Sequence, residues 1–231
     1  MRHKIMAVFM LNAKEIIVNM SMLTSLLLPV VMSLMFQRMD TAGAPMPFIV
    51  INVIIGITFA STLGAILMGL VAEENEHGTM EHMIVDRQDM AANFLGKALL
   101  LFPAAFLILG INLIVLGYMN LLSITIFPAL VLIWLFFYFS SAGFGMLSNS
   151  VAATSLFIMI LLFVFAMSPY IDFLIYDRNN IIRQFFELTP VYQIKHIEGG
   201  SLAGPYISLI LWVLLSLVFF MTVFNRRTKS L

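Results

Sequence analysis

Half of the acidic side chains fall in one short stretch between two long apolar runs. This charged stretch extends from Glu73 to Asp89 and holds six of the twelve Asp and Glu residues. These are Glu73, Glu74, Glu76, Glu81, Asp86 and Asp89. Because charge is costly inside a bilayer, a lipid-embedded protein keeps it where it meets water or another molecule. We therefore interpret the charged stretch as a contact surface for a second protein.

The same stretch contains side-chain types that bind divalent metal ions. The potential ligands are Glu73, Glu76, His77, Glu81 and His82. Their spacing does not favour a metal site, because His77 and His82 are five residues apart and fall on different faces of a helix. Gly78 also lies between them, and the zinc-protease pattern His-Glu-x-x-His is absent. We expect no metal here.

Two catalytic chemistries are also disfavoured. A phosphate-binding loop needs Gly-x-x-x-x-Gly-Lys followed by Ser or Thr. Here Gly96-Lys97 is followed by Ala98, and Ala91 takes the place of the first glycine. An intramembrane protease would need a pair of aspartates or a serine in Gly-x-Ser-x-Gly, and the segment that begins at Ser140 does not match. We expect a chain that is not an enzyme, with any ATP hydrolysis on a separate subunit.

The composition predicts an all-α membrane protein. The 231 residues are 61% hydrophobic and 10% charged, whereas soluble domains carry about 25% charged residues. A net charge of zero argues against a nucleic-acid partner. Without cysteine, the chain has neither a disulfide nor a thiolate metal ligand. The surface of such a protein faces lipid.

Gaps between the charged residues predict six transmembrane helices in a single domain, residues 1–231. The charge-free windows are Ile16–Gln37, Thr41–Ala72, Ala98–Ile171 and Gly199–Asn225, and the third is long enough for three spans. We expect spans at about 17–37, 48–71, 95–117, 122–148, 151–168 and 205–224. An even number of spans places both termini on one face of the membrane.

The distribution of Lys and Arg indicates that this face is cytoplasmic. Eight of these residues lie at the termini or on the side of the charged stretch: Arg2, Lys4, Lys14, Arg87, Lys97, Arg226, Arg227 and Lys229. Four lie in the opposite loops: Arg38, Arg178, Arg183 and Lys195. We therefore expect a multi-pass protein of the cell membrane whose termini and charged stretch face the cytoplasm.

Two segments outside the spans carry helical patterns. Residues 5–19 form either an interfacial helix on the inner leaflet or a ragged start to the first span. Residues 169–204 are too charged to span and too apolar for a free loop, so we expect two short helices at the outer leaflet. The turn between them is predicted at Asp177–Asn180, and Pro190 should end the second helix.

The centre of the charged stretch predicts a short helix. Gly78 would act as a hinge, and Thr79 is a favourable N-cap for a helix that ends near Val85. Met80, Met83 and Ile84 then share one apolar face. Such a face needs burial, which favours insertion into a groove on a cytosolic partner over an ordinary solvated loop.

Residues 74–85, read as Glu-Asn-Glu-His-Gly-Thr-Met-Glu-His-Met-Ile-Val, together with Gly96-Lys97, resemble the cytoplasmic signature of ABC-2 transporter permeases. The departures are His77, where a Lys or Arg is common, and Asp86-Arg87 after the short helix. The resemblance implies six spans, an N-terminal interfacial helix, a coupling helix in the first cytoplasmic loop, and outer helices between the last two spans. It also implies two permease subunits, as a homo- or heterodimer, with two ABC ATPase subunits that bind ATP and Mg.

The resemblance assigns coupling to the ATPase to residues of the charged stretch. These are Glu73, Glu74, Glu76, Gly78, Thr79, Glu81, Met83 and Ile84. It also places the translocation path along the first, second and fifth spans, with small polar groups at Ser25, Asn52, Thr58, Thr62, Thr154 and Ser155. Each of these groups is equally accounted for by a hydrogen bond between helices.

The expected function is export of a hydrophobic or amphipathic substrate, such as an antimicrobial or cytolytic peptide, a drug or a lipid, from a bacterial cell. The predicted spans hold no ionisable group at depth, which argues against ion coupling. An ATP-independent carrier or channel and a membrane-bound immunity protein remain alternatives. Small residues at Gly56, Ala60 and Gly64 lie on one helix face, and they serve either a subunit seam or packing within the chain.

Overall fold

The computed structural model describes residues 1–39, 46–78 and 87–230. Within these ranges the chain forms helices and no β-strand, which confirms the all-α class for this part of the chain. The predicted coupling helix, Thr79–Val85, lies outside the described residues.

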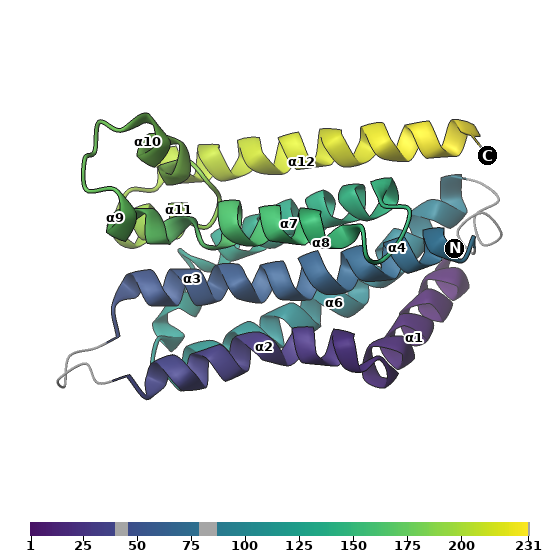
Figure 1. Ribbon diagram of the computed structural model, residues 1–231, viewed down its shortest axis with the longest axis horizontal. Helices are drawn as coiled ribbons and strands as arrows, with labels where there is room; N and C mark the ends of the chain where they lie inside the picture. Colours follow the sequence, from purple (N-terminus) through teal and green to yellow (C-terminus); the bar gives the residue numbers. More distant parts are fainter. Residues whose placement is uncertain (40–45, 79–86, 231) are drawn as a thin grey trace.

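Five helical rods in the described ranges are long and apolar enough to cross a membrane. They are α2 (Met20–Gln37), the continuous rod of α3 (Phe48–Phe59), η1 (Ala60–Leu67) and α4 (Met68–Glu76), then α6 (Arg87–Leu116), α7 (Phe127–Leu147) and α12 (Ala203–Ser230). A short 3-10 turn, η2 (Met119–Leu122), joins α6 to α7. The rods lie side by side along the long axis of the molecule (Figure 1).

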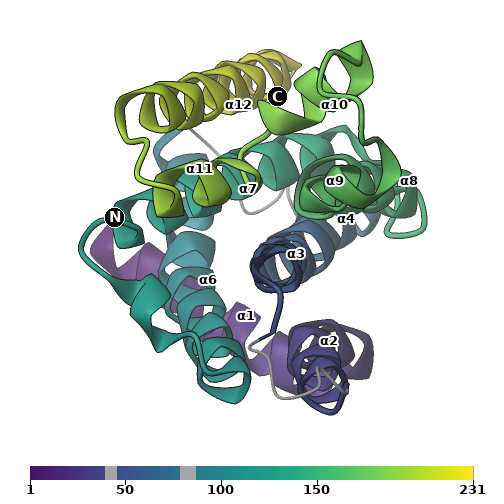
Figure 2. The same ribbon diagram turned by 90° about the vertical axis from the view of Figure 1, so that its left-hand side faces the viewer.

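The rod formed by α3, η1 and α4 is the centre of the bundle. In its most apolar window 83% of the residues are buried, against 17% in α2 and 22% in α12. Seen from one end, α3 lies between α2, α6 and α7 (Figure 2). Its sequence from Val50 to Phe59 is apolar on every side apart from Asn52 and Thr58, as expected for a helix surrounded by others.

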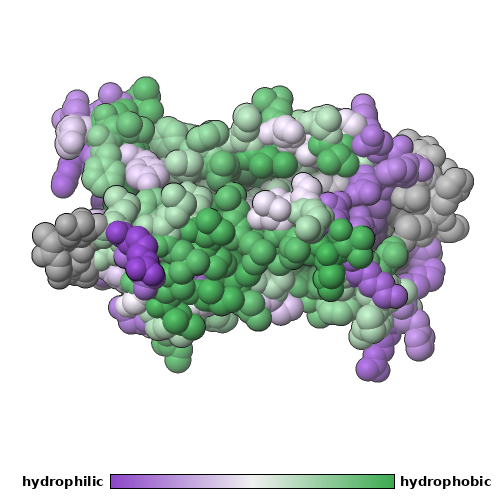
Figure 3. All heavy atoms as spheres, turned by 60° about the horizontal axis from the view of Figure 1, so that its bottom comes forward, coloured by the Kyte–Doolittle hydropathy of each residue, from purple (hydrophilic) through white to green (hydrophobic). Residues whose placement is uncertain are grey.

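The apolar surface forms a band between two polar ends. Figure 3 shows hydrophobic side chains along the middle of the molecule and hydrophilic ones at both ends. Large apolar residues of α12 such as Leu214, Leu215 and Val218 are also exposed. This pattern fits a multi-pass membrane protein, in which lipid covers the band.

A sixth crossing is present only if a bent pair of helices counts as one span. α8 (Thr154–Ile160) continues into the π-helical η3 (Leu161–Ala166), and the following η4 (Ser168–Tyr170) and α9 (Ile171–Leu174) form the second half of the pair. The two halves are bent by 51°. Pro169 lacks an amide hydrogen and disfavours helical geometry before it, which accounts for the break near the predicted end of this span.

α1 (Arg2–Val18) is a helix of its own rather than a ragged start to the first span. Asn19 separates it from α2 with an extended backbone (φ −82°, ψ 102°). The Asn19 side chain accepts hydrogen bonds from the backbone amides of Ser21 and Met22, and so caps the start of α2. α1 is inclined to the other helices and lies near α6 (Figure 1).

The segment between the fifth crossing and α12 has more helices than the two we expected. Besides α9 it contains α10 (Ile181–Glu187) and α11 (Gln193–Glu198). The predicted turn is present, because Asp177 accepts from the amide of Asn179 and Asn180 caps α10. α9 and α10 flank this turn as the two expected helices, and the additional helix is α11, which follows Pro190.

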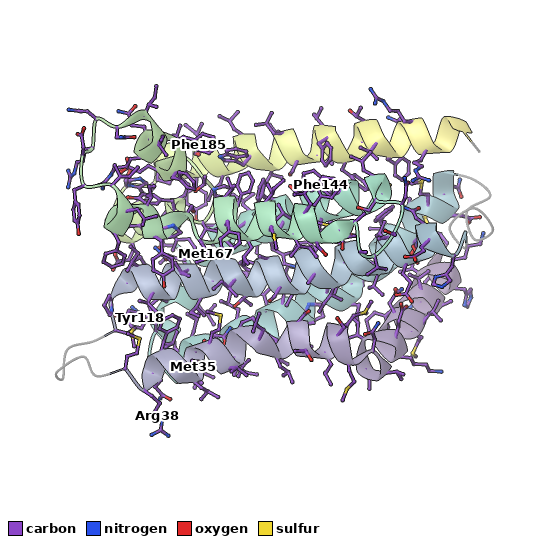
Figure 4. The ribbon with its side chains drawn as sticks, viewed as in Figure 1. Met35, Arg38, Tyr118, Phe144, Met167 and Phe185 are labelled. Carbon is purple, nitrogen blue, oxygen red and sulfur yellow. The ribbon has the colours of Figure 1, made fainter. Side chains whose placement is uncertain are left out.

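The two ends of the bundle carry different parts of the chain. The start of α1 and the ends of α4 and α12 lie at one end, whereas α9, α10 and α11 lie at the other (Figure 1). Arg38 is also at that other end and points away from the bundle, while Tyr118 lies nearby against the bundle (Figure 4). The Tyr118 hydroxyl donates to the Met46 carbonyl at 2.6 Å and ties η2 to the start of α3.

Candidate functional site

The candidate site is the acidic end of α4, where the central rod leaves the bundle. Glu73, Glu74 and Glu76 occupy its last turn, and Gly78 follows the C-cap residue His77. Gly78 has φ +65°, in the left-handed region that favours glycine after a helix. The other predicted coupling residues, Thr79, Glu81, Met83 and Ile84, lie outside the described residues.

Glu74 binds the side chain of Lys97 on α6. The Lys97 ammonium lies 2.7 Å from one Glu74 carboxylate oxygen, and Asn93 donates to the other at 3.0 Å. Lys97 also donates to the Asn93 side-chain oxygen. Lys97 is completely buried, and a buried ammonium persists only when it is paired and hydrogen-bonded. This network fixes the end of α4 to α6.

Glu73 faces Glu15 on α1. Both side chains are partly buried. Burial raises the pKa of Glu15 to about 7, and the nearby charge of Glu73 acts in the same direction. Lys97 opposes this shift in the Glu15 pKa, but it is already bound to Glu74. The contact joins the end of α4 to α1.

Asn75 binds the end of α7. Its side-chain amide donates to the carbonyls of Gly145, Met146 and Ser148 at 3.1, 3.3 and 3.1 Å. The last carbonyls of a helix lack amide donors within that helix. The Asn75 side chain supplies hydrogen bonds to these carbonyls at the end of α7. Arg227 on α12 donates to the Met146 carbonyl at 2.8 Å and brings a third helix to the same point.

Glu76 reaches the segment that starts the fifth crossing. Its carboxylate accepts from the Val151 amide at 2.9 Å. Successive residues of an α-helix are turned by about 100°, so residues 73–76 point in four different directions. The end of α4 is therefore tied to α1, α6, α7 and the start of α8 through four consecutive side chains.

The packing of α1 on α6 depends on a glycine. A Cβ atom at Gly96 would lie 2.8 Å from the Val8 Cβ and 2.9 Å from the Ile5 carbonyl oxygen, so only glycine allows this close approach. The ion pair between Lys4 and Asp89 holds the same two helices together. Gly96 thus positions α1, and with it Glu15, beside the end of α4.

The predicted path residues are held mainly by their own helices. Thr58 and Thr62 are buried and donate to the carbonyls of Ile54 and Thr58 at 2.7 Å. Thr58 also accepts from the Asn112 side chain of α6 at 2.9 Å. Asn52 is completely buried, and neither its amide nitrogen nor its oxygen has a hydrogen-bond partner.

The remaining predicted path residues lie on α2 and α8, not on the central rod that carries Asn52, Thr58 and Thr62. Ser25 on α2 donates to the Ser21 carbonyl at 3.0 Å. Thr154 is buried and donates to the Val151 carbonyl at 2.6 Å, whereas its neighbour Ser155 is exposed. The contact of Asn112 with Thr58 was not predicted from the sequence. Ser25 and Ser155 lie on other helices, α2 and α8.

The row of small residues on the central rod packs within the chain. A Cβ at Gly56 would collide with the backbone carbonyl of Ala166 in η3, and one at Gly64 would lie 3.8 Å from Leu161. Close approach of η3 to the rod therefore accounts for Gly56 without a second subunit, whereas a Cβ at Gly64 would make an ordinary contact.

An apolar groove of about 420 Å³ lies between α6, α7 and α12. Phe94 and Leu95 come from α6, Trp134 from α7, and Phe220 and Phe224 from α12. Its lining residues carry no charge, so its surface suits apolar chains only.

Among the described residues, no group of three or more His, Asp or Glu side chains is arranged to hold a metal ion. His77 instead contacts the Glu73 carbonyl oxygen through its ring nitrogen Nδ1 at 3.0 Å. The arrangement thus consists of charge pairs and hydrogen bonds that link helices.

Sequence reasoning missed the side chains of other helices that lie against Glu73 and Glu74. Lys97 carried a usable signal, because a cation just inside an apolar run needs a buried acidic partner. Glu15 and Asn93 carried no such signal, since the residues they contact lie on another helix. No protein-family model matches the chain, and no curated protein or solved structure matches it.

Proposed function

We propose that the chain is the membrane subunit of an ATP-driven ABC exporter of the ABC-2 type. The observation that carries this proposal is the end of α4. Four consecutive side chains face four other elements, and the chain then continues into the stretch that resembles the ABC-2 signature. The helical bundle and the common end of α1, α4 and α12 support the proposal.

In the proposed mechanism, the ATPase subunits bind ATP and close, and the groove that holds residues 79–85 moves with them. The end of α4 follows because Gly78 directly joins it to this segment. Glu74 passes the movement to α6, and Asn75 and Glu76 pass it to α7 and the start of α8. Packed helices move as rigid bodies, so the cargo cavity changes shape.

The proposed cargo is hydrophobic or amphipathic. Within the long apolar helices of the described ranges, Lys97 is the buried charged side chain, and Glu74 already neutralises it. The buried polar groups near the middle of the central rod are the amide of Asn52 and the hydroxyls of Thr58, Ser61 and Thr62. Such an interior suits a lipid, a lipophilic drug or an apolar peptide better than a charged solute.

The test uses two variants of the charged stretch with the chain purified together with its ATPase. Glu81→Lys reverses a charge in the proposed contact, and Gly78→Pro removes the conformation that follows α4. We expect both variants to insert and to bind the ATPase, but to lose cargo-stimulated ATP hydrolysis. Arg178→Glu, a charge reversal in the turn at the opposite end, is the matched control and should keep it. Unchanged stimulation in both variants would contradict the proposal.

A further inference from the structure

The apolar groove between α6, α7 and α12 opens on the surface of the bundle. Its α6 wall consists of Ala91, Phe94, Leu95 and Ala98, which recur at i, i+3, i+4 and i+7 and so share one helix face. Ala91 and Ala98 are partly buried, and their short side chains leave room beside the aromatic residues of α7 and α12. Leu95 and Met221, which also line the groove, are exposed. A molecule in the surrounding lipid can therefore enter from the side.

Ring contacts fix the shape of the groove. Phe94 of α6 and Phe220 of α12 pack edge to face, with their ring centroids 5.0 Å apart. On α7, the Trp134 ring stacks on Tyr138 at 4.9 Å. The Tyr138 hydroxyl donates to the Phe94 carbonyl at 2.5 Å and joins α7 to α6. The groove is thus formed before any ligand enters, as is usual for binding sites of small molecules.

The size of the groove suits a single hydrocarbon chain. It holds about 420 Å³ and follows α6 from Ala91 to Ala98, or roughly 10 Å along the helix. A helix about 10 Å across would fill roughly 800 Å³ over that length, so a helix of another chain does not fit inside. Lipid covers the apolar surface of a membrane protein, and its acyl chains are the apolar molecules present at this position.

Positive charge lies beyond one end of the groove. Phe220, Phe224 and Arg227 recur at i, i+4 and i+7, so Arg227 continues the groove-facing side of α12 by about one turn. Residues 225–231 contain three basic residues and no acidic one. Basic segments beside a membrane attract anionic phospholipid headgroups. The charge of this end of α12 therefore complements a phosphate group.

Two acidic groups near the α6 wall are paired within the protein. Asp89, which precedes the groove on α6, forms an ion pair with Lys4 of α1. Glu74 of α4 binds Lys97 of α6 at 2.7 Å. Neither carboxylate adds a net negative charge beside the groove, because each has a cation as its partner.

We propose that the groove binds one acyl chain of an anionic phospholipid, whose phosphate group lies beside the basic end of α12. The lipid belongs to the leaflet at the end of the bundle where the chain termini lie (Figure 1). Because lipid tails are as apolar as the groove, close packing against Phe94 and Phe220 holds the chain, and charge selects the headgroup. The site shares no residue with the predicted translocation path, and it does not rest on the proposed function.

The experiment follows tryptophan fluorescence of the full chain in vesicles without ATPase or cargo. The chain has two tryptophans, so Trp212→Phe leaves Trp134, which lines the groove, as the single reporter. Bromine atoms on an acyl chain quench a tryptophan that they contact. Vesicles of dioleoylphosphatidylcholine receive rising fractions of phosphatidylglycerol or phosphatidylcholine, each with bromine added to its oleoyl chains.

We expect half-maximal quenching at an at least fivefold lower fraction of brominated phosphatidylglycerol, about the preference that one basic residue near a membrane gives. The double variant Arg226→Gln, Lys229→Gln should weaken this preference severalfold. Arg178→Gln, the same kind of change at an exposed position of the opposite end, should leave it unchanged. Equal quenching by the two lipids in the reporter chain would overturn the proposal of an anionic lipid.

Two substitutions on α6 distinguish the groove from the surrounding lipid. Ala98→Phe places a ring in the groove and should remove most of the quenching of Trp134. Leu99→Phe lies next to it at an exposed position outside the lining, and it should keep the quenching. Quenching in Ala98→Phe that equals that of the reporter chain would show that lipid reaches Trp134 without the groove, and it would overturn the proposal.

A second readout needs no substitution. Native mass spectrometry of the unaltered chain, released into mild detergent from vesicles with equal amounts of the two lipids, should show one bound phosphatidylglycerol. A chain without lipid, or with both lipids in equal amounts, would overturn the proposal. Neither measurement involves transport, so failure here is distinguishable from failure of the proposed function.

Discussion

The ammonium group of Lys97 lies 2.7 Å from the carboxylate of Glu74, and this pair fixes the third apolar rod to the end of the second. Lys97 is completely buried and Glu74 nearly so. The pair is one of four contacts that surround the last turn of α4. A movement of that turn therefore reaches several helices at once.

Loss of one partner from this pair should destabilise the protein strongly. Lys97→Met leaves the Glu74 carboxylate without its cation, and we expect the free energy of unfolding to fall by about 3–5 kcal/mol. The double variant Lys97→Met, Glu74→Met should recover much of this loss, because no unpaired charge remains. Denaturant unfolding in lipid micelles measures both. Equal losses of stability in the single and double variants would contradict the assignment of Lys97 and Glu74 as a buried ion pair.

The glycine at the crossing of α1 and α6 gives a second prediction. Gly96→Ala places a methyl group against Val8 and the Ile5 carbonyl, so α1 must move away. We expect a loss of about 1–3 kcal/mol, as for other overpacked sites. Gly110→Ala on the same helix has open space around its Cβ and is the matched control. Thermal unfolding of both variants tests this, and similar melting temperatures would argue against the close approach.

Asn75 gives a third prediction, because it is a donor that a carboxylate cannot replace. Asn75→Asp removes the amide hydrogens that bind the carbonyls at the end of α7. We expect a loss of about 1–3 kcal/mol and faster hydrogen exchange at residues 145–148. Asn179→Asp, an exposed change in the outer turn, controls for the added charge. Unchanged exchange at residues 145–148 would show that Asn75 does not hold this end of α7.

The outer helices give a fourth prediction through Arg183. Its guanidinium group donates to Glu187 at 2.8 Å, to Asp172 at 2.9 Å and to the Ile175 carbonyl at 2.6 Å. The hydrogen bond to Glu187 raises the pKa of Arg183, so the charge is permanent. Lysine cannot span this set of acceptors, and Arg183→Lys should therefore loosen α9 and α10.

Limited proteolysis in residues 175–180 measures this loosening of the outer helices. Arg178→Lys, an equivalent change at an exposed position in the turn, should leave the cleavage rate unchanged. A cleavage rate for Arg183→Lys that equals that of the unaltered chain would contradict the prediction.

The sequence predicted local features of the fold better than contacts across it. Charge-free windows located the long apolar helices, because lipid exposure leaves little room for Asp, Glu, Lys or Arg. The central rod extends to Glu76, beyond the predicted limit of residue 71, since its acidic residues find partners on other helices. The 51° bend in the fifth crossing was not predicted, since the sequence at Pro169 indicated only the end of a span.

The contacts of the candidate site were even harder to predict from the sequence. Glu73 and Glu74 stood out by their charge, but their partners Glu15 and Lys97 are 58 and 23 residues away. No periodic pattern connects positions so far apart in the sequence. The resemblance to ABC-2 permeases named the acidic residues without indicating that each of them holds a different helix.

The most direct test of the central claim is cargo movement in sealed vesicles that contain the purified chain with or without its ATPase. A fluorescent lipophilic peptide reports the movement. The account predicts transport only when the chain, the ATPase and ATP are all present, and its loss in Glu81→Lys while basal hydrolysis continues. Transport by the chain alone, or transport that ignores ATP, would contradict it.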